Sequence, residues 1–236
     1  VQSSISITPT VGDADVTNNY SFKVDTIRAS YDPNMIEVSP TGLVLPCDEL
    51  LYTVHFENTG NDTAYNIHVM DTLSDNVELR GMQIVSAPEG MQLAYTTYGG
   101  HNVVKFDFPN IKLLDSSHPG QNMAQFSFKV KVKNGLPDGV VIPNRVGIYF
   151  DANEVVMTNQ VENTIGIAPI VGPNSICGTG QITLTCATPG GVWTASNALA
   201  TVAGGTVTGV ARGIDTIIYT VTNACVSRSS TKDITV

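Results

Sequence analysis

Hydrophobic and polar side chains alternate along most of the chain with the two-residue period of a β-strand. Tyr52, Val54 and Phe56 alternate with polar neighbours, and a second alternating run follows at residues 65–69. Each run predicts a strand with one buried and one solvent-exposed face. The stretch between them is rich in asparagine, glycine and aspartate, which favour turns, so the two runs are predicted to form a β-hairpin.

The clearest alternation lies at residues 126–133. Every second residue there is apolar and is predicted to point into a core: Phe126, Phe128, Val130 and Val132. The residues between them are serine and lysine, and lysines on a strand also discourage pairing with another sheet edge. Helical periodicity is nearly absent, so the chain is predicted to be all-β with little or no helix.

The alternating pattern is interrupted at residues 167–172, where proline and glycine predict a linker. After it, short Thr- and Val-rich strands at regular spacing predict a small immunoglobulin-like (Ig-like) sandwich at residues 173–236. Residues 30–166 are predicted to form a larger sandwich, so the fold class is tandem β-sandwiches with Ig-like or Greek-key connections. Residues 1–29 are predicted to be a strand segment, either the end of a preceding module or an added edge strand.

Composition and charge narrow the function classes. Charged residues make up 14% and hydrophobic residues 42% of the chain, which is a globular composition. The 12 Lys and Arg against 21 Asp and Glu give a net charge of −9, which argues against binding to nucleic acid or to anionic membranes. No apolar stretch approaches the roughly 18 residues of a membrane span. The N-terminus lacks the pattern of a signal peptide, so the sequence is expected either to start after processing or to be a segment of a longer protein, and its strand-like ends favour a segment.

Oxygen-bearing side chains in two predicted loops are candidate calcium ligands: Asp32, Asn34, Asp151, Asn153 and Asn159. Calcium takes six to eight such oxygens, and extracellular modules often bind it weakly. The alternative is that these residues form turns whose side chains cap backbone groups. No cofactor other than this candidate Ca²⁺ is expected.

Catalytic motifs are missing from the sequence. There is no GxSxG, HExxH, P-loop or GxGxxG pattern, and no pair of carboxylates stands out, so no enzymatic activity is expected. Tyr95 and Tyr98, beside two glycines, are the candidate ligand-binding aromatic residues.

Several short motifs occur in an order that resembles a known family. They are SYDPN at residues 30–34, YTVHFENTG at 52–60, DTAYNI at 62–67, DTL at 71–73, NRVGIYFDAN at 144–153 and TN at 158–159. In this order they resemble a conserved repeat-type domain of large secreted Bacteroidota surface proteins, over residues 30–166. The resemblance implies a domain without enzymatic activity that lies beside Ig-like or PKD-like modules and a type IX secretion sorting domain. One departure is that Met35 and Ile36 follow Asn34, where a DPNDK-like sequence is expected.

The end of the chain is similar to the Ig-like modules of the same proteins. The matching pieces are IC at residues 176–177, TPGGVWT at 188–194, GTVTGV at 205–210 and YTVTNAC at 219–225.

The resemblance to these modules implies a disulfide between Cys177 and Cys225. The alternatives are a Cys186–Cys225 bond beside the single tryptophan, a buried free thiol at Cys186, or a bond from Cys47 to Cys186 if the linker folds back. No two cysteines form a CxxC pair, which argues against zinc or thioredoxin-like chemistry.

Asp-Thr-apolar triplets are the candidate modification sites. The resemblance implies a bacterium that O-glycosylates such triplets after export, and the candidate threonines are Thr26, Thr63, Thr72 and Thr216. Asn61 begins an N-glycosylation sequon on a predicted turn. The alternative is chance occurrence in a threonine-rich β protein.

Together, these patterns favour a structural segment of a secreted cell-surface adhesin, filament or surface-layer protein. The segment is expected to act as an extracellular spacer or assembly module whose partners are other copies of itself or neighbouring modules. The alternatives are a carbohydrate- or protein-binding module, or an accessory domain of a large secreted enzyme.

Overall fold

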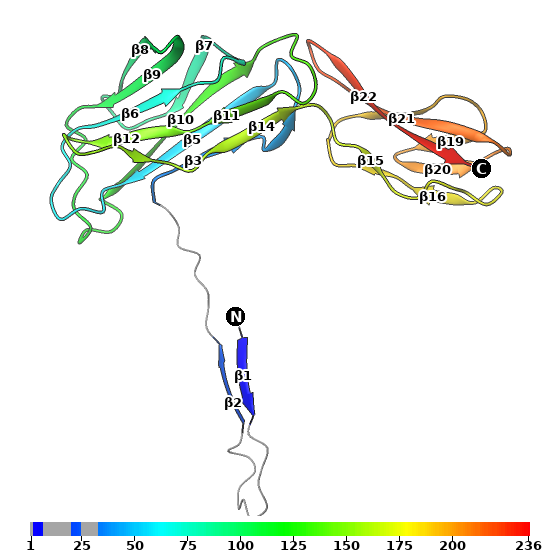
Figure 1. The fold of residues 1–236 in the computed structure, drawn as a ribbon, viewed down its shortest axis with the longest axis horizontal. Helices are drawn as coiled ribbons and strands as arrows, with labels where there is room; N and C mark the ends of the chain where they lie inside the picture. The colour runs from blue at the N-terminus through cyan, green and yellow to red at the C-terminus, as the bar shows by residue number, and fades with distance from the viewer. Residues whose placement is uncertain (1, 7–19, 25–32) are drawn as a thin grey trace, which may run out of the picture. The chain divides into compact units, whose positions relative to one another are not determined.

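The computed structural model describes residues 2–6, 20–24 and 33–236 (Figure 1). The chain divides into two compact units, residues 1–32 and residues 33–236. In the first unit β1 (Gln2–Ser6) pairs antiparallel with β2 (Tyr20–Val24). Every element of the described residues is a β-strand, which confirms the predicted all-β class.

Three sheets build the larger sandwich. The first, in spatial order, is β3 (Met35–Ser39), β5 (Glu49–Glu57), β10 (Met123–Val132) and β7 (Val77–Ser86). The second is β13 (Val156–Met157), β12 (Val146–Phe150), β6 (Ile67–Thr72), β9 (His101–Phe108) and β8 (Gln92–Tyr98). The third is β11 (Val141–Asn144), β14 (Val161–Ile165) and β4 (Gly42–Val44).

The core of this sandwich is built by the residues that alternation selects. Phe126 and Phe128 on β10 are fully buried, whereas Lys131 on the opposite face is exposed. The ring of Phe106 lies 4.6 Å from that of Phe126, centroid to centroid, so β9 and β10 meet across the core. Burial of each such side chain stabilises the fold by about 1.5–3 kcal/mol, so alternation in sequence becomes the main source of stability.

The predicted hairpin between residues 50–56 and residues 65–69 is wrong. β5 pairs with β3 and β10, whereas β6 pairs with β12 and β9 in the other sheet. Alternation requires each strand to bury one face, but it does not select the partner strand. The chain therefore crosses from one sheet to the other where a turn-rich stretch suggested a tight hairpin.

The first and last strands of the larger sandwich lie side by side. After β3 the chain passes a cis Ser39–Pro40 peptide and continues as β4, which pairs in parallel with β14. Asn163 donates from Nδ2 to the carbonyl oxygens of Pro40 and Gly42, at 2.9 and 3.2 Å. The amide of Asn159 bonds both the N–H and the carbonyl of Ile36, at 2.9 and 3.0 Å. Asn159 thereby occupies backbone groups at the edge of β3.

The smaller sandwich follows without a free linker. Its sheets, in spatial order, are β16 (Gln181–Thr183), β20 (Thr206–Gly209) and β19 (Ala200–Ala203); β18 (Val192–Ala195), β21 (Ile214–Thr222) and β22 (Ser227–Thr235); and β15 (Ile170–Val171) with β17 (Thr185–Cys186). The predicted linker differs from the structure because Ala168 and Ile170 are buried. Their N–H groups donate to Thr188 Oγ1 at 2.8 Å and to Ser230 Oγ at 3.2 Å, so the stretch is part of the sandwich.

Tyr219 organises the smaller core. Its hydroxyl donates to the carbonyl of Thr188 and accepts from the N–H of Gly191, both at 2.8 Å. The ring lies so close to Gly191 that a Cβ there would clash with it. Trp193 is half-buried and packs against Tyr219 with 4.6 Å between ring centroids.

A buried carboxyl group lies in the core of the larger sandwich. Asp71, on β6, is fully buried and accepts one hydrogen bond, from Nδ2 of the buried Asn144 at 3.1 Å. The Oδ1 atoms of both side chains have no hydrogen-bond partner. Burial raises the pKa of Asp71 from 3.8 to about 7, against the opposing effect of the bond from Asn144. Burial also raises the pKa of Tyr52, and the nearby Asp71 adds to that rise.

The raised pKa of Asp71 predicts a pH-dependent stability. Between about pH 4 and pH 7 the unfolded chain has lost this proton while the folded protein retains it, so stability falls as the pH rises through this window and is constant above it. A rise in the pKa of Asp71 from 3.8 to about 7 corresponds to a loss of about 4 kcal/mol of stability across this window. Asp71→Asn should remove this part of the pH dependence, as measured by urea unfolding at pH 4, 5.5, 7 and 8.

Glu89→Gln is the matched control, because Glu89 is an exposed carboxylate and the substitution should leave the wild-type pH profile intact. Parallel profiles for wild type and Asp71→Asn would show that Asp71 does not retain a proton in the folded protein.

Candidate functional site at the junction of the two sandwiches

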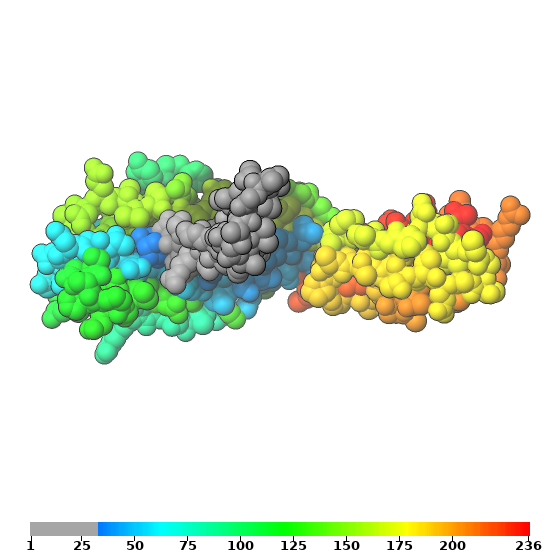
Figure 2. Space-filling model, turned by 90° about the horizontal axis from the view of Figure 1, so that it is seen from below, coloured from blue at the N-terminus to red at the C-terminus, as the bar shows by residue number. Residues whose placement is uncertain are grey.

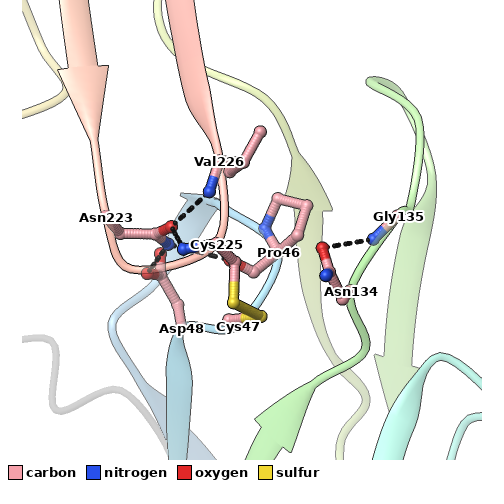
Figure 3. The surroundings of a disulfide bond; sticks show 8 residues. All are labelled: Pro46, Cys47, Asp48, Asn134, Gly135, Asn223, Cys225 and Val226. Carbon is pink, nitrogen blue, oxygen red and sulfur yellow. Dashed lines mark hydrogen bonds between the residues drawn. A yellow bond between two sulfur atoms is a disulfide. The ribbon is translucent and has the colours of Figure 1, made fainter.

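A disulfide bond joins the two sandwiches. Cys47, in the turn between β4 and β5, is bonded to Cys225, in the turn between β21 and β22 (Figure 3). The two cysteines are 178 positions apart in the sequence, and their Cα atoms are 6.1 Å apart. On the chain-entropy account, closing a loop of this length stabilises the folded state by about 5 kcal/mol. The cysteine pair is therefore a strong covalent constraint between two separate cores.

The predicted pairing of Cys177 with Cys225 is wrong. Cys177 is an exposed free thiol that lines a cavity with Val210 and Val236, beyond the end of β22 opposite to Cys225. The nine residues of β22 span about 30 Å, whereas a disulfide requires Cα atoms within about 7 Å.

Cys186 is a free, half-buried thiol whose Sγ donates to the carbonyl of Ala168 at 3.2 Å. The alternative of a buried free thiol at Cys186 is thus confirmed in that the thiol is free, but the residue is half-buried rather than buried. Its bonds to Cys225 or Cys47 are not formed.

The turn that carries Cys47 is held from both sides. The N–H of Cys47 donates to the carbonyl of Val132 at 3.0 Å, and the N–H of Val132 donates to the carbonyl of Asp48 at 2.9 Å. Oδ2 of Asp48 accepts from the N–H of Leu45 at 2.7 Å. Cys47 has a φ of 70°, in the left-handed region, which these bonds maintain. The position of the Cys47 side chain is therefore fixed by β10 and by the turn itself.

Asn223 shapes the opposite turn and also binds the larger sandwich. Its Oδ1 accepts from the N–H groups of Cys225 and Val226, at 2.9 and 3.0 Å (Figure 3). Its Nδ2 donates to the carbonyl of Pro46 and to Oδ1 of Asp48, at 2.8 and 2.9 Å. One side chain thus positions Cys225 and reaches across the junction to the residues on either side of Cys47.

Arg228 adds a second polar contact across the junction. Its Nε donates to Oδ1 of Asp138 at 2.8 Å, and its Nη2 donates to the carbonyl of Leu136 at 3.3 Å. Asp138 is 60% exposed, so the ion pair contributes at most about 1 kcal/mol. Its main effect is to fix orientation, because it lies on a different loop of the larger sandwich from the disulfide.

An apolar contact completes the junction. Leu45, which follows β4 in the larger sandwich, is 4% exposed and packs in the core of the smaller sandwich. The N–H of Gly166 donates to the carbonyl of Val44 at 3.0 Å, so the chain leaves the larger sandwich beside this leucine. In Figure 2 the smaller sandwich, coloured yellow to red, meets the larger one over this narrow region.

The candidate calcium ligands are mostly engaged by the backbone. Asp151 accepts from the N–H groups of Tyr65 and Asn66, and Oδ1 of Asn34 accepts from the N–H of Glu57 at 3.2 Å. The amide of Asn159 is bonded to β3, as described above, and Asp32 lies outside the described residues.

Asn34 and Asn153 line one cavity of about 230 Å³, whereas Asn159 lines another. Among the described residues no group of three or more His, Cys, Asp or Glu is placed to hold a metal ion. Of the four candidates that the structure describes, Asn34 and Asn153 lie around one cavity, and calcium binding stays a prediction.

The candidate glycosylation sites differ in accessibility. Asn61 is exposed and Thr63 is half-buried on a turn, and Thr72 is exposed on β6. Thr216 is half-buried, and its Oγ1 donates to Asp233 at 2.6 Å. The acidic members of the last two triplets, at positions 71 and 215, are fully buried, so the folded protein does not present them to an enzyme. Position 26 lies outside the described residues, and modification stays a prediction.

The two candidate ligand-binding tyrosines do not form one platform. On β8, Tyr95 lies opposite Val104 and Tyr98 lies opposite His101. Side chains along a strand point alternately to the two faces of the sheet, so residues three positions apart lie on opposite faces. Tyr98, which is 80% exposed, instead lines a hollow of about 380 Å³ with Arg145 and Tyr149.

The floor of this hollow includes Gly147, where a Cβ would approach Val155 to 2.8 Å. Nε of Arg145 donates to the carbonyl of Thr158 at 2.7 Å, which holds the guanidinium at the rim. The ring of Tyr149 stacks on His68 with 4.5 Å between centroids. Burial lowers the pKa of His68, with a further lowering from Lys105, so the ring beside Tyr149 favours its neutral form.

The described residues contain no helix long and apolar enough to cross a membrane.

The sequence was compared with family profiles and with curated proteins, and one family profile matches it. The profile of a family described as "Domain of unknown function (DUF7619)" matches residues 32–164. No curated protein matches the chain.

Solved structures of bacterial surface proteins are similar in fold. BcpA, the major pilin subunit of Bacillus cereus, is 16% identical with a TM-score of 0.40, over 86% of this chain and 66% of BcpA. The C-terminal domain of the Streptococcus pyogenes antigen I/II-family protein AspA is 8% identical with a TM-score of 0.47, over 86% of this chain and 98% of that domain. The chain thus spans about two thirds of the BcpA structure. TM-scores below 0.5 do not support the transfer of a function.

The connectivity at the junction predicts a defined thiol inventory. Non-reducing peptide mapping should find one disulfide, between the peptides that contain Cys47 and Cys225, and two free thiols. Cys177 should react with a maleimide in the folded protein, and Cys186 should react much more slowly because it is half-buried. Unfolding in urea without reductant should make the two thiols equally reactive.

Cys177→Ser is the matched control, since it should remove the fast-reacting thiol and leave the disulfide peptide unchanged. A linkage that includes Cys177 or Cys186 would contradict the junction as described.

Proposed function

Starting from the fact that the chain belongs to the DUF7619 family through residues 32–164, we propose that it is a structural module of a secreted cell-surface protein. In this role it acts as a spacer that holds neighbouring parts of the protein at a fixed separation and orientation. The observation that carries the proposal is the junction between the sandwiches, where a disulfide, an asparagine bridge and an apolar contact converge.

A spacer differs from a flexible tether in how its modules are joined. Inter-domain contacts that are small and polar usually allow relative motion. Here the bond between Cys47 and Cys225 prevents separation, and Arg228 contacts Asp138 on a second loop. Two attachment points that do not coincide restrict rotation as well as separation. Leu45, buried in the core of the smaller sandwich, adds an apolar contact at the junction.

The disulfide also bears on location. Disulfides persist in oxidising surroundings such as the periplasm, the cell surface and the extracellular medium, and they are rare in the cytosol. An exposed Cys225 would be reduced by cytosolic thiols, whereas outside the cell it keeps its bond. This supports an extracellular location, which is where a surface spacer acts.

A fixed junction predicts that the two sandwiches reorient as one body. Residual dipolar couplings of the oxidised, ¹⁵N-labelled chain should fit one alignment tensor for residues 33–165 and 167–236 together. The variant Cys47→Ser/Cys225→Ser combined with Asn223→Ala and Arg228→Ala should need two tensors, because the disulfide and both polar contacts across the junction are lost. Arg212→Ala, an exposed arginine away from the junction, is the matched control and should behave as wild type. Two independent tensors in the oxidised wild type would rule out a rigid spacer.

A carbohydrate-binding module is the second candidate function. The specific observation in its favour is the hollow over Gly147, where Tyr98 and Tyr149 offer aromatic faces and Arg145 offers polar N–H groups. Aromatic rings that bury the C–H face of a sugar, together with a few polar groups, are the usual elements of such sites.

A glycan array tests the second candidate. Binding by wild type that falls tenfold or more in Tyr149→Ala would support it. Tyr65→Ala, an exposed tyrosine outside the hollow, should retain binding. An array without any bound glycan, or equal binding by the two variants, would remove this candidate.

A further inference from the structure

We propose that residues 33–236 carry tension and that the Cys47–Cys225 bond makes this part of the chain nearly inextensible, by removing residues 48–224 from the path that bears the force. The inference rests on the proposed spacer function for its biological setting. Its physical basis is separate, because it depends only on which residues are covalently connected and on the direction of two strands.

In the larger sandwich the path that bears the force follows two consecutive strands, β3 and β4. β3 pairs antiparallel with β5, from Met35 opposite His55 to Ser39 opposite Leu51. The chain continues through β4, which ends at Val44, three residues before Cys47. Since Cys47 is bonded to the end of β10 at the junction, β3 and β4 lead from the far end of the sandwich to the disulfide in one pass.

In the smaller sandwich the path is also a single strand. β22 begins at Ser227, two residues after Cys225, and runs antiparallel to β21 as far as Thr235. In Figure 1 the strand β22, drawn in red, leads to the C-terminal end of the chain, which the letter C marks. A force applied at Val236 therefore passes along β22 to the disulfide without passing through any other strand.

The shortest covalent connection between Pro33 and Val236 is thus β3, β4, the disulfide and β22. The remaining strands of both sandwiches, from β5 to β21, belong to a closed loop outside this connection, and the disulfide joins the two ends of the loop. Even complete unfolding of that loop would not lengthen the connection, because its two ends are fixed to each other at Cys47 and Cys225.

The line itself has little slack. A residue in a strand already advances about 3.3 Å, and a fully stretched residue advances at most about 3.6 Å. The line is also supported from the side: β4 is bonded in parallel to β14, and Asn159 and Asn163 bond the backbone of residues 36, 40 and 42. Tension along β3 and β4 loads these bonds together in shear rather than one after another.

Without the disulfide the force takes a different route. It must pass from β22 through the smaller sandwich, across the buried stretch at residues 167–170 and through the larger sandwich. Unfolding of either core would then lengthen the chain. Because 178 positions separate the two cysteines, reduction should release about 600 Å of additional contour length under load.

Single-molecule force spectroscopy on the full chain, with handles at residues 1 and 236, tests this directly. The oxidised wild type should lack the extension that corresponds to residues 48–224. After treatment with dithiothreitol, the same molecules should gain about 600 Å when both sandwiches unfold. In this exchange dithiothreitol is oxidised to its cyclic disulfide and Cys47 and Cys225 each gain a hydrogen.

Two variants sharpen the comparison. Cys47→Ser/Cys225→Ser should show the long extension without reductant, and Cys177→Ser/Cys186→Ala should behave as oxidised wild type, since those thiols are free. The reduction arm uses wild-type protein that has already folded, so the test remains decisive if the serine variant fails to fold. Equal total extension of oxidised and reduced wild type would overturn the proposal.

The result is separable from the spacer function. If dipolar couplings show two independent bodies but the oxidised chain still lacks the long extension, the spacer proposal fails and the tension path stands. If the sandwiches reorient as one body but oxidised molecules extend fully, the tension path fails and the spacer proposal stands.

Discussion

The parallel pairing of β4 with β14 is the constraint on which the rest of the arrangement depends. It places Val44 opposite Ile165, so the turn that follows the first strands and the exit of the chain lie at the same end of the larger sandwich. Leu45 and Cys47 follow Val44 within three residues and therefore lie beside the domain that the chain forms after Ile165. The smaller sandwich forms at that end, with its β21–β22 turn against the turn of Cys47. A different partner for β4 would separate the cysteines.

Asparagine side chains support this pairing at places where the backbone groups have no hydrogen-bond partner in a neighbouring strand. Asn163 satisfies two carbonyls beside the Ser39–Pro40 peptide, and Asn159 occupies the edge of β3. Asn223 plays the same role at the junction, where its two ends bond different sandwiches. An amide both donates and accepts, so a single side chain can join two backbone segments that are not themselves paired. Fixing the ends of the strands thus depends on a few amides as much as on the core.

Sequence alone predicts the strands more reliably than their partners. Alternation at residues 126–132 identifies β10 and its buried face correctly, since burial of one face follows from local pattern. The same reasoning pairs β5 with β6 incorrectly, because the partner is selected by the global path of the chain. The inward-facing Asp71 also breaks the alternation of apolar and polar residues. Burial raises its pKa to about 7, and this rise cannot be read from the local sequence.

The junction was harder to predict for the same reason. Cys47 is the single cysteine of the larger sandwich, which is the one local signal of a bond between modules. Pairing within the smaller sandwich was the simpler expectation, but the length of β22 separates Cys177 from Cys225. Asp48, Asn223 and Arg228 carried no signal, because their roles exist only once the two turns meet.

The bond between Cys47 and Cys225 also changes what counts as a module. Each sandwich has its own core, yet each carries only half of the covalent link. Recombination that exchanged either sandwich for an ordinary Ig-like unit would leave one unpaired thiol at a turn shaped to present it. The two sandwiches therefore form one structural unit. A duplication, insertion or engineered graft must move residues 33–236 together to keep the disulfide intact.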